Sequence, residues 1–410
     1  MKYQTPVAIT GMGCLSAAGR NLMENMASLC TGKRRAAPPT RFSSSHTTTY
    51  PVFETFENTS ISFSQKNKAI SRTSRLGLYA ALEAIEDAGW TPRKLATKRT
   101  GVCMGTTVGS AMNNEEFYIK YRQGQNPDLE VIDKYLRSNP AAVIAREFGL
   151  SGPCQTIVNA CSSGTDAIGV GASWIRSGIC DVVIAGGADE LCRVTYNGFI
   201  SLMITDDEVC KPFDKNRKGL NLGEGAAILL LESEDTVRER KKAPRSFVLG
   251  YGSASDAYHL TAPRPDGCGL KQALHDAMAE SHTAIEDIAF VNAHGTATPD
   301  NDRVEGRVLR ELLPGVPFLS TKGFTGHTLG AAGAIEAAFT VACLEARRIP
   351  SSAGFTTMDP ELGVSPANQS MALNRLAAIS ESLAFGGHNS ALVLGLSNRE
   401  EERTIRENLN

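Results

Sequence analysis

The sequence of 410 residues is 42% hydrophobic and 21% charged, with a formal net charge of −2. These values predict an ordinary globular chain, built as one large domain or two fused domains, and give no bulk electrostatic reason for nucleic-acid binding. The ten cysteines form no C-x-x-C pair, which argues against a zinc site of that type and a disulfide scaffold, and favours a reducing cytoplasm. The N-terminus has no basic segment before an apolar run, and no window reaches the ~18–20 apolar residues of a spanning helix, so we expect neither a signal peptide nor a membrane span.

Short apolar runs alternate with helix-like stretches along the chain. Strands are expected at residues 7–10, 182–185, 226–231, 289–291 and 391–396, and helices at 76–88 and 333–347. Alternation of this kind predicts an α/β protein whose strands are buried on both faces. The charged segment 232–245 is predicted to divide a first half, residues 1–245, from a second half, residues 246–410. An exposed helix within one domain is the alternative interpretation of this segment.

The first expected strand runs into a Gly-x-Gly segment. Gly11 and Gly13 resemble the start of a dinucleotide-binding loop, but the third small position is Ser16. A basic stretch, residues 32–35, lies where the acidic residue that binds the ribose is expected. We therefore interpret the segment as a tight turn from strand to loop.

Cys161 lies in NACSSGTDAIG, residues 159–169, a run with almost no side-chain bulk. Ile168, Ala172 and Ile175 form an apolar stripe and predict a helix that is weak by propensity, which is stable only when neighbouring backbones pack closely against it. Cys161 would lie at the N-terminal end of this helix, where free N–H groups and the helix dipole lower the pKa of a thiol. A nucleophile and a small structural cysteine are both compatible with this stretch.

Two histidines lie in turns rich in glycine and threonine. His294 follows the strand that ends at residue 291, at the sheet edge where ligand sites collect. His327 precedes a helix predicted over residues 328–347, whose dipole keeps the imidazole neutral. The segment LAFGGHN, residues 383–389, precedes the last strand, and its paired glycines indicate a tight turn or the flexible lip of a site.

Four of these segments together resemble the β-ketoacyl-acyl-carrier-protein synthases. They are NACSSG at 159–164, NAHGTATP at 292–299, STKGFTGHTLGAAGAIE at 320–336 and FGGHN at 385–389. The resemblance covers nearly the whole chain, from ITGMG at 9–13 through KPFDKNRKGLNLGEGAA at 211–227 to ALVLG at 391–395. It implies a thiolase-like, five-layered αβαβα fold with two similar halves, a homodimer, and no metal or organic cofactor.

The resemblance also implies a role for each residue of the site. Cys161 would accept the acyl group from a carrier protein, and His294 and His327 would stabilise the enolate formed when malonyl-carrier protein loses CO₂. The enolate would then attack the acyl thioester and extend the chain by two carbons. Lys322 would hold the histidines' hydrogen-bond network, and Glu336 would be the buried acid that balances the charge of the lysine.

Further residues would bind the substrates. Thr296 and Thr298 match the hydroxyls that hold the pantetheine arm, and Val108 resembles the floor of the acyl pocket. The backbone N–H groups of Cys161 and Leu383 would form the oxyanion hole. An acidic carrier protein would dock on basic residues, for which Lys211 is the strongest candidate. The others are Lys66, Lys68, Arg72, Arg75, Lys215 and Arg217.

The lip departs from the usual Phe-Gly-Phe-Gly-Gly-Thr-Asn pattern of the family. Leu383 replaces the first phenylalanine and Ala384 the first glycine, which favours a specialised polyketide or polyene role, with or without a partner subunit. A non-catalytic chain-length factor would lack the nucleophile, and a degradative thiolase would need a second cysteine within residues 386–389. A cysteine amidohydrolase would use a cysteine and a histidine, but would need neither a second histidine nor Lys322.

Overall fold

The computed structural model describes residues 5–56, 70–107, 109 and 114–397. Lys66, Lys68 and Val108, all predicted to contact substrates or carrier protein, lie outside the described residues. The helices are α1 (Leu22–Thr31), α2 (Arg72–Asp87), α3 (Pro92–Leu95), α4 (Glu115–Arg122), α5 (Glu130–Leu136), α6 (Pro140–Phe148), α7 (Ser163–Arg176), α8 (Arg193–Ser201), α9 (Glu234–Arg240), α10 (Cys268–Ser281), α11 (Pro299–Leu312), α12 (Lys322–Thr325) and α13 (Ala332–Glu345).

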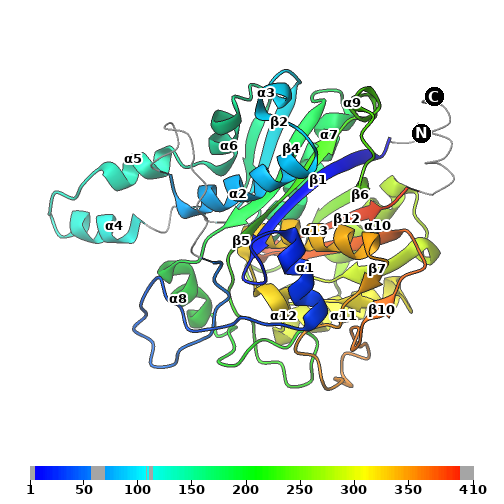
Figure 1. Ribbon diagram of the computed structural model, residues 1–410. Coiled ribbons are helices and arrows are strands. Elements are labelled where there is room, and N and C mark those ends of the chain that lie inside the picture. Colours follow the sequence, from blue (N-terminus) through cyan, green and yellow to red (C-terminus); the bar gives the residue numbers. More distant parts are fainter. Residues whose placement is uncertain (1–4, 57–69, 108, 110–113, 398–410) are drawn as a thin grey trace.

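Most strands join one large sheet in the order β3-β2-β4-β5-β1-β6-β12-β11-β7-β8 (Figure 1). They are β1 (Val7–Ser16), β2 (Thr100–Gly105), β3 (Cys154–Ile157), β4 (Val182–Asp189), β5 (Gly225–Glu232), β6 (Ser246–Ser255), β7 (Ile288–Asn292), β8 (Phe318–Leu319), β11 (Ala377–Leu383) and β12 (His388–Gly395). A separate small pair consists of β9 (Arg348–Ile349) and β10 (Met371–Ala372). The predicted strands all fall on observed ones, except that Leu396 lies beyond the end of β12.

The large sheet repeats one five-strand pattern. In the first half β1 pairs antiparallel with β5, β5 antiparallel with β4, and β2 lies parallel between β4 and β3. In the second half β6, β12, β11, β7 and β8 follow the same sequence of antiparallel and parallel pairings. The halves meet where β1 pairs with β6, from Val7 opposite Val248 to Ile9 opposite Ser246. The expectation of two similar halves is thus confirmed.

The helices complete a five-layered arrangement (Figure 1). The two halves of the sheet form the two β layers, and α7 and α13 make up the central layer. α7 packs on β2 and β4, α13 packs on β5 of the first half and β11 of the second, and the two helices contact each other. On the outer faces, α2 and α6 cover the first half of the sheet and α10 covers β6 and β12 of the second. The predicted α/β fold class and its αβαβα layers are confirmed.

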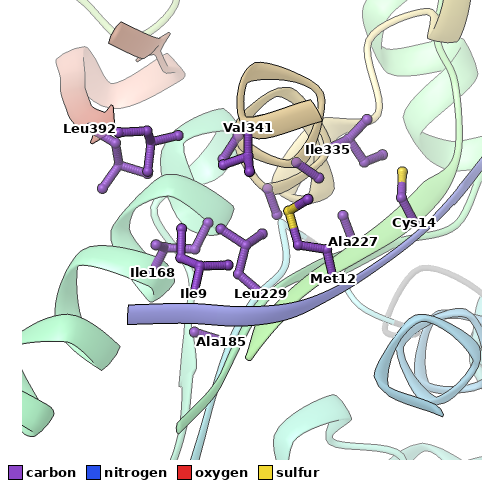
Figure 2. Close-up of a cluster of buried hydrophobic side chains, with 14 of the residues drawn as sticks. Ile9, Met12, Cys14, Ile168, Ala185, Ala227, Leu229, Ile335, Val341 and Leu392 are labelled. Atoms are coloured by element: carbon purple, nitrogen blue, oxygen red, sulfur yellow. The ribbon is translucent and has the colours of Figure 1, made fainter. Parts of the chain in front are cut away.

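A hydrophobic core fills the space between the central helices and the strands (Figure 2). Ile9 and Leu229 from the sheet meet Ile168 of α7 and Val341 of α13, and all four side chains are fully buried. Burial of one such side chain contributes roughly 1.5–3 kcal/mol. Because α13 is buried along almost its whole length, the polar side chain of Glu336 on this helix lies deep in the protein.

The prediction of a turn at Gly11 and Gly13 is wrong, because β1 continues through both residues to Ser16. The absence of side chains at Gly11 and Gly13 instead allows α2 to pack closely on the strand. A Cβ atom on Gly11 would lie 2.2 Å from the backbone oxygen of Ala84, and one on Gly13 would lie 2.1 Å from that of Ala80.

The charged segment 232–245 contains α9 and connects β5 to β6. The segment therefore contains a helix, as the alternative interpretation expects. This helix lies between the last strand of the first five-strand pattern and the first strand of the second. The division into residues 1–245 and 246–410 stays a prediction. No helix within the described ranges is long and apolar enough to cross a membrane.

Candidate active site

Cys161 lies in a short 3-10 turn, η3 (Ala160–Ser162), directly before α7, as the sequence predicts. Ala160 adopts a left-handed conformation with φ of 49° and turns the chain sharply before the thiol. Asp166, one helical turn later, accepts hydrogen bonds from the Asn159 side-chain amide and the Ser162 hydroxyl, both at 2.9 Å. These bonds hold the cysteine turn against the first turn of α7.

Asp166 also ties this turn to the second half of the protein. Its other carboxylate oxygen accepts hydrogen bonds from the Tyr251 hydroxyl, at 2.9 Å, and from the Ser390 hydroxyl. Sequence reasoning missed Asp166 because its partners lie on β6 and β12, far away in the chain.

The predicted close approach of neighbouring backbones to α7 is present at Gly164. A Cβ atom there would lie 2.8 Å from the backbone nitrogen of Ala334 and 2.9 Å from the backbone oxygen of Gly330. Gly330 belongs to η5 (Leu329–Ala331), the turn that follows His327. The absence of a side chain at Gly164 therefore allows the cysteine turn and the His327 segment to lie together.

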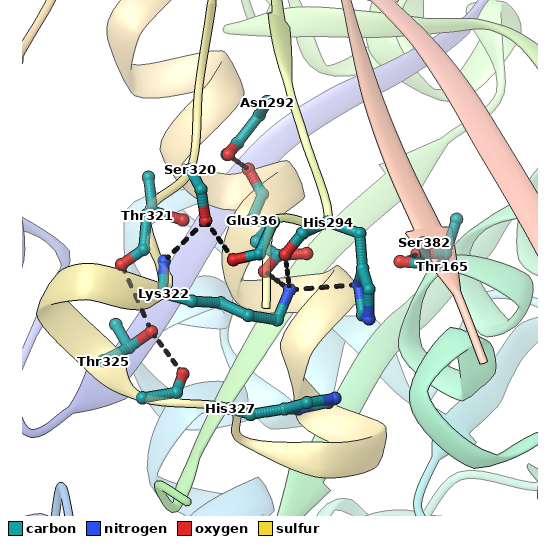
Figure 3. A network of polar contacts seen from close by, with 12 residues as sticks. Thr165, Asn292, His294, Ser320, Thr321, Lys322, Thr325, His327, Glu336 and Ser382 are labelled. Carbon is teal, nitrogen blue, oxygen red and sulfur yellow. Dashed lines mark hydrogen bonds and ion pairs between the residues drawn. The ribbon is translucent and has the colours of Figure 1, made fainter. Parts of the chain in front are cut away.

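The two histidines face each other at a right angle (Figure 3). Their ring centroids are 5.3 Å apart and their planes differ by 85°. His294 follows β7, as predicted, and its backbone N–H donates to Glu305 of α11 at 2.5 Å. The Gly295 N–H donates to the other oxygen of the same carboxylate at 2.8 Å. Glu305 thus fixes the turn that carries His294.

Lys322 links His294 to an acid, Glu336, as Figure 3 shows. Its Nζ lies 3.0 Å from His294 Nδ1 and 2.6 Å from the His294 carbonyl oxygen, and it forms an ion pair with Glu336. An ammonium group only donates, so His294 Nδ1 accepts. His327 Nδ1 accepts from the Leu329 N–H at 3.1 Å. Both neutral rings therefore carry their proton on Nε2.

Burial sets the charge of this site. Burial and the nearby Lys322 hold the pKa values of His294 and His327 well below their usual range, so both rings are neutral. Burial raises the pKa of Glu336 to about 7, although Lys322 acts in the opposite direction. The site is therefore a buried cationic lysine with two neutral imidazoles as N–H donors.

The thiol of Cys161 differs from the sequence expectation. Burial raises its pKa to about 11, although Lys322 and a hydrogen bond from the Phe385 backbone N–H lower it. The predicted fall in the thiol pKa at the helix N-terminus is wrong, because desolvation of a fully buried thiolate outweighs the favourable charges. Cys161 is therefore a protonated thiol near neutral pH.

The backbone N–H that donates to the Cys161 thiol belongs to Phe385, two residues after Leu383, whose N–H the resemblance assigns to the oxyanion hole. Leu383 is still in the sheet, opposite Asn389, and the chain leaves β11 only afterwards. Phe385 begins the turn η6 (Phe385–Gly387), and its ring stacks on Phe199 of α8 with centroids 5.5 Å apart. Phe385 is therefore a second candidate, beside Leu383, for the donor that acts together with the Cys161 N–H.

A cavity of about 270 Å³ brings together six of the predicted residues. Its walls include Cys161, His294, His327, Thr296, Thr298 and Leu383. The hydroxyls of Thr296 and Thr298 lie 2.9 Å apart. Lys322 and Glu336 lie behind His294 rather than on the wall. Phe385, Phe199 and Lys218 also line the cavity and were not among the predicted binding residues.

The basic residues proposed for docking divide into two groups. Arg72 is held by the buried Glu224 at 2.7 Å, and Arg217 by Asp359 at 2.6 Å. Both arginines are therefore mostly buried in ion pairs inside the fold, which leaves little of either side chain for docking. Lys211 is half-buried, and its Nζ lies 2.5 Å from Oε2 of Glu208, an acid on the surface. Its role in docking stays a prediction.

The sequence analysis did not identify Glu305, although the spacing of buried residues on α11 indicates it. Asn301, Glu305 and Leu309 recur every four residues on α11 and share its buried face. An acidic residue on the apolar face of a helix is a candidate for a buried role.

Comparison with known sequences decides the family. The sequence model described as "Beta-ketoacyl synthase, N-terminal domain" matches residues 4–236, and "Beta-ketoacyl synthase, C-terminal domain" matches residues 245–356. This chain belongs to the β-ketoacyl synthase family. It is 31% identical over 402 residues to 3-oxoacyl-[acyl-carrier-protein] synthase 2 of Synechocystis sp., with 94% of this chain and 97% of that protein covered.

Solved structures agree with this assignment. "The ishigamide ketosynthase/chain length factor" is 30% identical, with a TM-score of 0.88 and coverage of 96% of this synthase and 100% of that chain. A chain of "Ketosynthase (ApeO) in Complex with its Chain Length Factor (ApeC) from Xenorhabdus doucetiae" is 29% identical, with a TM-score of 0.82 and coverage of 97% of this synthase and 99% of that chain. The synthase thus has the thiolase-like fold, and its reaction is Claisen condensation that elongates a fatty-acid or polyketide chain. The amidohydrolase alternative falls away.

Proposed function

We propose that Cys161, His294, His327 and Lys322 carry out this condensation with acyl- and malonyl-carrier protein as substrates. The observation that supports this assignment most is the arrangement of the two histidines. Each is buried and neutral, and each has its Nδ1 occupied by a fixed donor, which leaves an Nε2–H on the wall of the cavity that holds Cys161. Two such donors fit the single oxygen of a thioester enolate.

The first half-reaction loads the acyl group. The sulfur of Cys161 attacks the thioester carbonyl, and its proton leaves with the departing carrier thiol. The negative oxygen of the tetrahedral intermediate is held by the backbone N–H groups of Cys161 and Phe385. One such donor contributes roughly 3–4 kcal/mol to transition-state stabilisation. Since the Cys161 thiol is protonated at rest, this proton passes from its sulfur to the carrier sulfur in the course of the exchange, and no net proton is released.

The second half-reaction begins with malonyl-carrier protein, whose pantetheine arm lies against Thr296 and Thr298. The malonyl carboxylate leaves as CO₂, and the bonding electrons form an enolate on the thioester oxygen. The Nε2–H groups of His294 and His327 donate to this oxygen. Lys322, with its positive charge at His294 Nδ1, makes that imidazole a stronger donor.

Carbon–carbon bond formation completes the cycle. The enolate carbon attacks the acyl thioester, and collapse of the intermediate expels the sulfur of Cys161. Because burial raises the pKa of this thiol to about 11, the expelled thiolate takes up one proton from the solvent and the enzyme returns to its resting form.

Mass analysis of the intact protein tests these roles. The synthase is incubated with a panel of acyl-carrier proteins, and the acyl mass added to Cys161 is recorded. Cys161→Ala is expected to lose loading completely while malonyl decarboxylation, which the histidines support, continues. Acyl-enzyme formation in Cys161→Ala would remove this cysteine from the mechanism.

A second subunit belongs to this proposal. β3 is an edge strand of the large sheet, and α4 and α5 project from the body and bury none of their side chains (Figure 1). Tyr121 and Leu136 on this arm are 64% and 71% exposed. An open edge and an apolar arm support association with another chain. A homodimer or a heterodimer with a related subunit satisfies both features, and the native mass of the chain expressed alone distinguishes them.

The lip supports a specialised role in polyketide or polyene elongation. Leu383 and Ala384 replace the usual phenylalanine and glycine, and two similar structures are ketosynthases solved with a chain length factor. Acidic carrier protein would approach over Lys211 and over Lys218 at the cavity wall. All ten cysteines are unpaired, which supports a cytoplasmic location.

A further inference from the structure

The basic stretch at residues 32–35, which follows α1, has one side chain that turns inward. Gly32 ends α1 in a left-handed conformation, with φ of 72°, and redirects the chain. An isolated β-bridge then fixes Ala37. Between these two points Arg35 is exposed, whereas Arg34 is half-buried. The segment therefore presents a guanidinium to the protein interior.

Arg34 connects this segment to the short helix that carries Lys322, which lies beside it (Figure 1). Its Nε donates to the carbonyl oxygen of Gly323, in α12, at 2.7 Å. Its Nη2 donates to the carbonyl oxygen of Cys210 at 2.5 Å and lies 4.0 Å from the sulfur of that residue. The Cys210 thiol in turn donates to the carbonyl oxygen of Lys322 at 3.6 Å. One guanidinium thus holds the helix of the lysine both directly and through Cys210.

α12 needs such a contact because it contains only one turn. A helix of four residues is not stable alone, and its carbonyl groups have no partners within it. A longer helix would direct the N–H of His327 to the carbonyl of Gly323, four residues earlier. The His327 N–H donates instead to the carbonyl oxygen of Asn221, at 2.8 Å. Arg34 therefore supplies the donor that Gly323 lacks where the helix ends.

The neighbouring backbone leaves room for the guanidinium. A Cβ atom on Gly354 would lie 3.1 Å from Nη1 of Arg34 and 2.8 Å from the carbonyl oxygen of Cys210. Gly354 also has a φ of 89°, in the region that favours glycine. A Cβ atom on Gly323 would lie 2.3 Å from the backbone oxygen of Ala353. The guanidinium and α12 therefore pack directly against the same backbone segment.

A guanidinium suits this position better than other donors do. Its N–H groups have a fixed planar geometry, so it can reach two carbonyl oxygens at once. A hydrogen bond from a charged donor is about twice as strong as one from a neutral donor. Among the described residues Arg34 forms no ion pair with an acid, so these two backbone carbonyls are the partners of its charge.

We propose that Arg34 is a positioning residue for Lys322, because it fixes the backbone of the helix that carries this lysine. The Lys322 ammonium lies 3.0 Å from His294 Nδ1 and pairs with Glu336, so a shift of α12 would weaken both contacts. His294 would then stabilise the enolate less. The hydrogen bonds of Arg34 do not reach the turn of Cys161, so acyl loading does not depend on them. This inference rests on the roles proposed above for Lys322 and His294.

Two partial reactions of the same protein test this role. Arg34→Ala is expected to lower the rate of malonyl decarboxylation about tenfold or more, since charge-assisted hydrogen bonds are lost. Acyl loading of Cys161, measured by intact mass, is expected to stay within about twofold of the wild type. Arg35→Ala is the matched control, since this exposed guanidinium lies 4.5 Å from the centroid of the Phe56 ring, and both rates should be unchanged. Parallel losses of both rates in Arg34→Ala, or an unchanged decarboxylation rate, overturn the proposal.

Arg34→Lys applies the same test if Arg34→Ala does not fold. Lysine keeps the positive charge and the long aliphatic stem, but its ammonium lacks the planar fork that reaches two carbonyl oxygens. Decarboxylation is again expected to fall more than acyl loading. Equal changes in the two rates overturn the proposal.

Hydrogen exchange followed by mass spectrometry reports on α12 without any assay of activity. The amide N–H groups of Phe324 and Gly326 donate to carbonyl oxygens of the same turn at 2.9 Å, which protects them from exchange. In Arg34→Ala these amides should exchange about tenfold faster or more than in the wild type and in Arg35→Ala. Unchanged exchange overturns the proposal. Absence of decarboxylation in the wild type would instead refute the proposed function, and the exchange result would stand independently of it.

Discussion

Substitution of Gly164 by alanine tests whether the contact between α7 and η5 positions the nucleophile. The added Cβ atom would meet the Ala334 nitrogen at 2.8 Å and the Gly330 oxygen at 2.9 Å. Both atoms belong to backbone, so no side chain can rotate away. Ordinary contact at 3.4 Å requires the two segments to separate by about 0.6 Å.

The expected cost follows from this displacement. Overpacking of a rigid contact lowers the free energy of unfolding by roughly 1–3 kcal/mol. The higher helix propensity of alanine compared with glycine raises it by roughly 1 kcal/mol. We therefore expect a net loss of about 0–2 kcal/mol. Activity is more sensitive, because a misplacement near 1 Å can lower the rate about 100-fold. Gly164→Ala should reduce condensation far more than it reduces stability.

Gly198→Ala on α8 is the matched control. A Cβ atom there meets nothing within 4 Å, and the residue is exposed. This variant should gain up to about 1 kcal/mol and retain full activity. Both variants are measured by urea unfolding and by single-turnover condensation. Wild-type condensation rates in Gly164→Ala would refute the idea that this contact sets the position of Cys161.

Three further predictions concern the site and its mouth. Glu336 has a pKa of about 7, so the decarboxylation rate should fall as pH drops through this value, because protonation releases Lys322 from its ion pair. In Glu336→Gln this fall at low pH should be absent, and the decarboxylation rate above pH 7 should be about tenfold or more below that of the wild type. An unchanged fall at low pH in this variant would show that a group other than Glu336 titrates. Charge reversal at Lys211 should raise the KM for carrier-bound substrate more than for a pantetheine mimic, and equal changes would place Lys211 away from the docking face. Leu383→Phe adds bulk at the cavity wall and should slow loading of long or polyunsaturated acyl groups more than short saturated ones; a competition assay that yields the same product spectrum as the wild type would remove Leu383 from acyl selection.

The sequence alone determined much of the architecture and indicated the residues that we propose to react. The sequence indicates Cys161 because it precedes a glycine-rich helix, and His294 because it follows a strand. Both positions are defined by neighbouring segments of the chain. The αβαβα layers follow from the alternation of apolar runs and helices together with the family resemblance. These features are local or repetitive, so they leave a pattern in one dimension.

Tertiary structure decided the properties that depend on surroundings. Burial, not the helix N-terminus, governs the Cys161 thiol, since desolvation depends on every segment packed around it. The end of β11 decides that Phe385, rather than Leu383, presents its N–H to the sulfur. Glu381 lies in a strand buried on both faces, where no periodicity predicts what surrounds its carboxyl group. Charge and hydrogen bonding act through space over a few ångströms, and only the folded chain brings α11, α12, α13 and β11 within that distance.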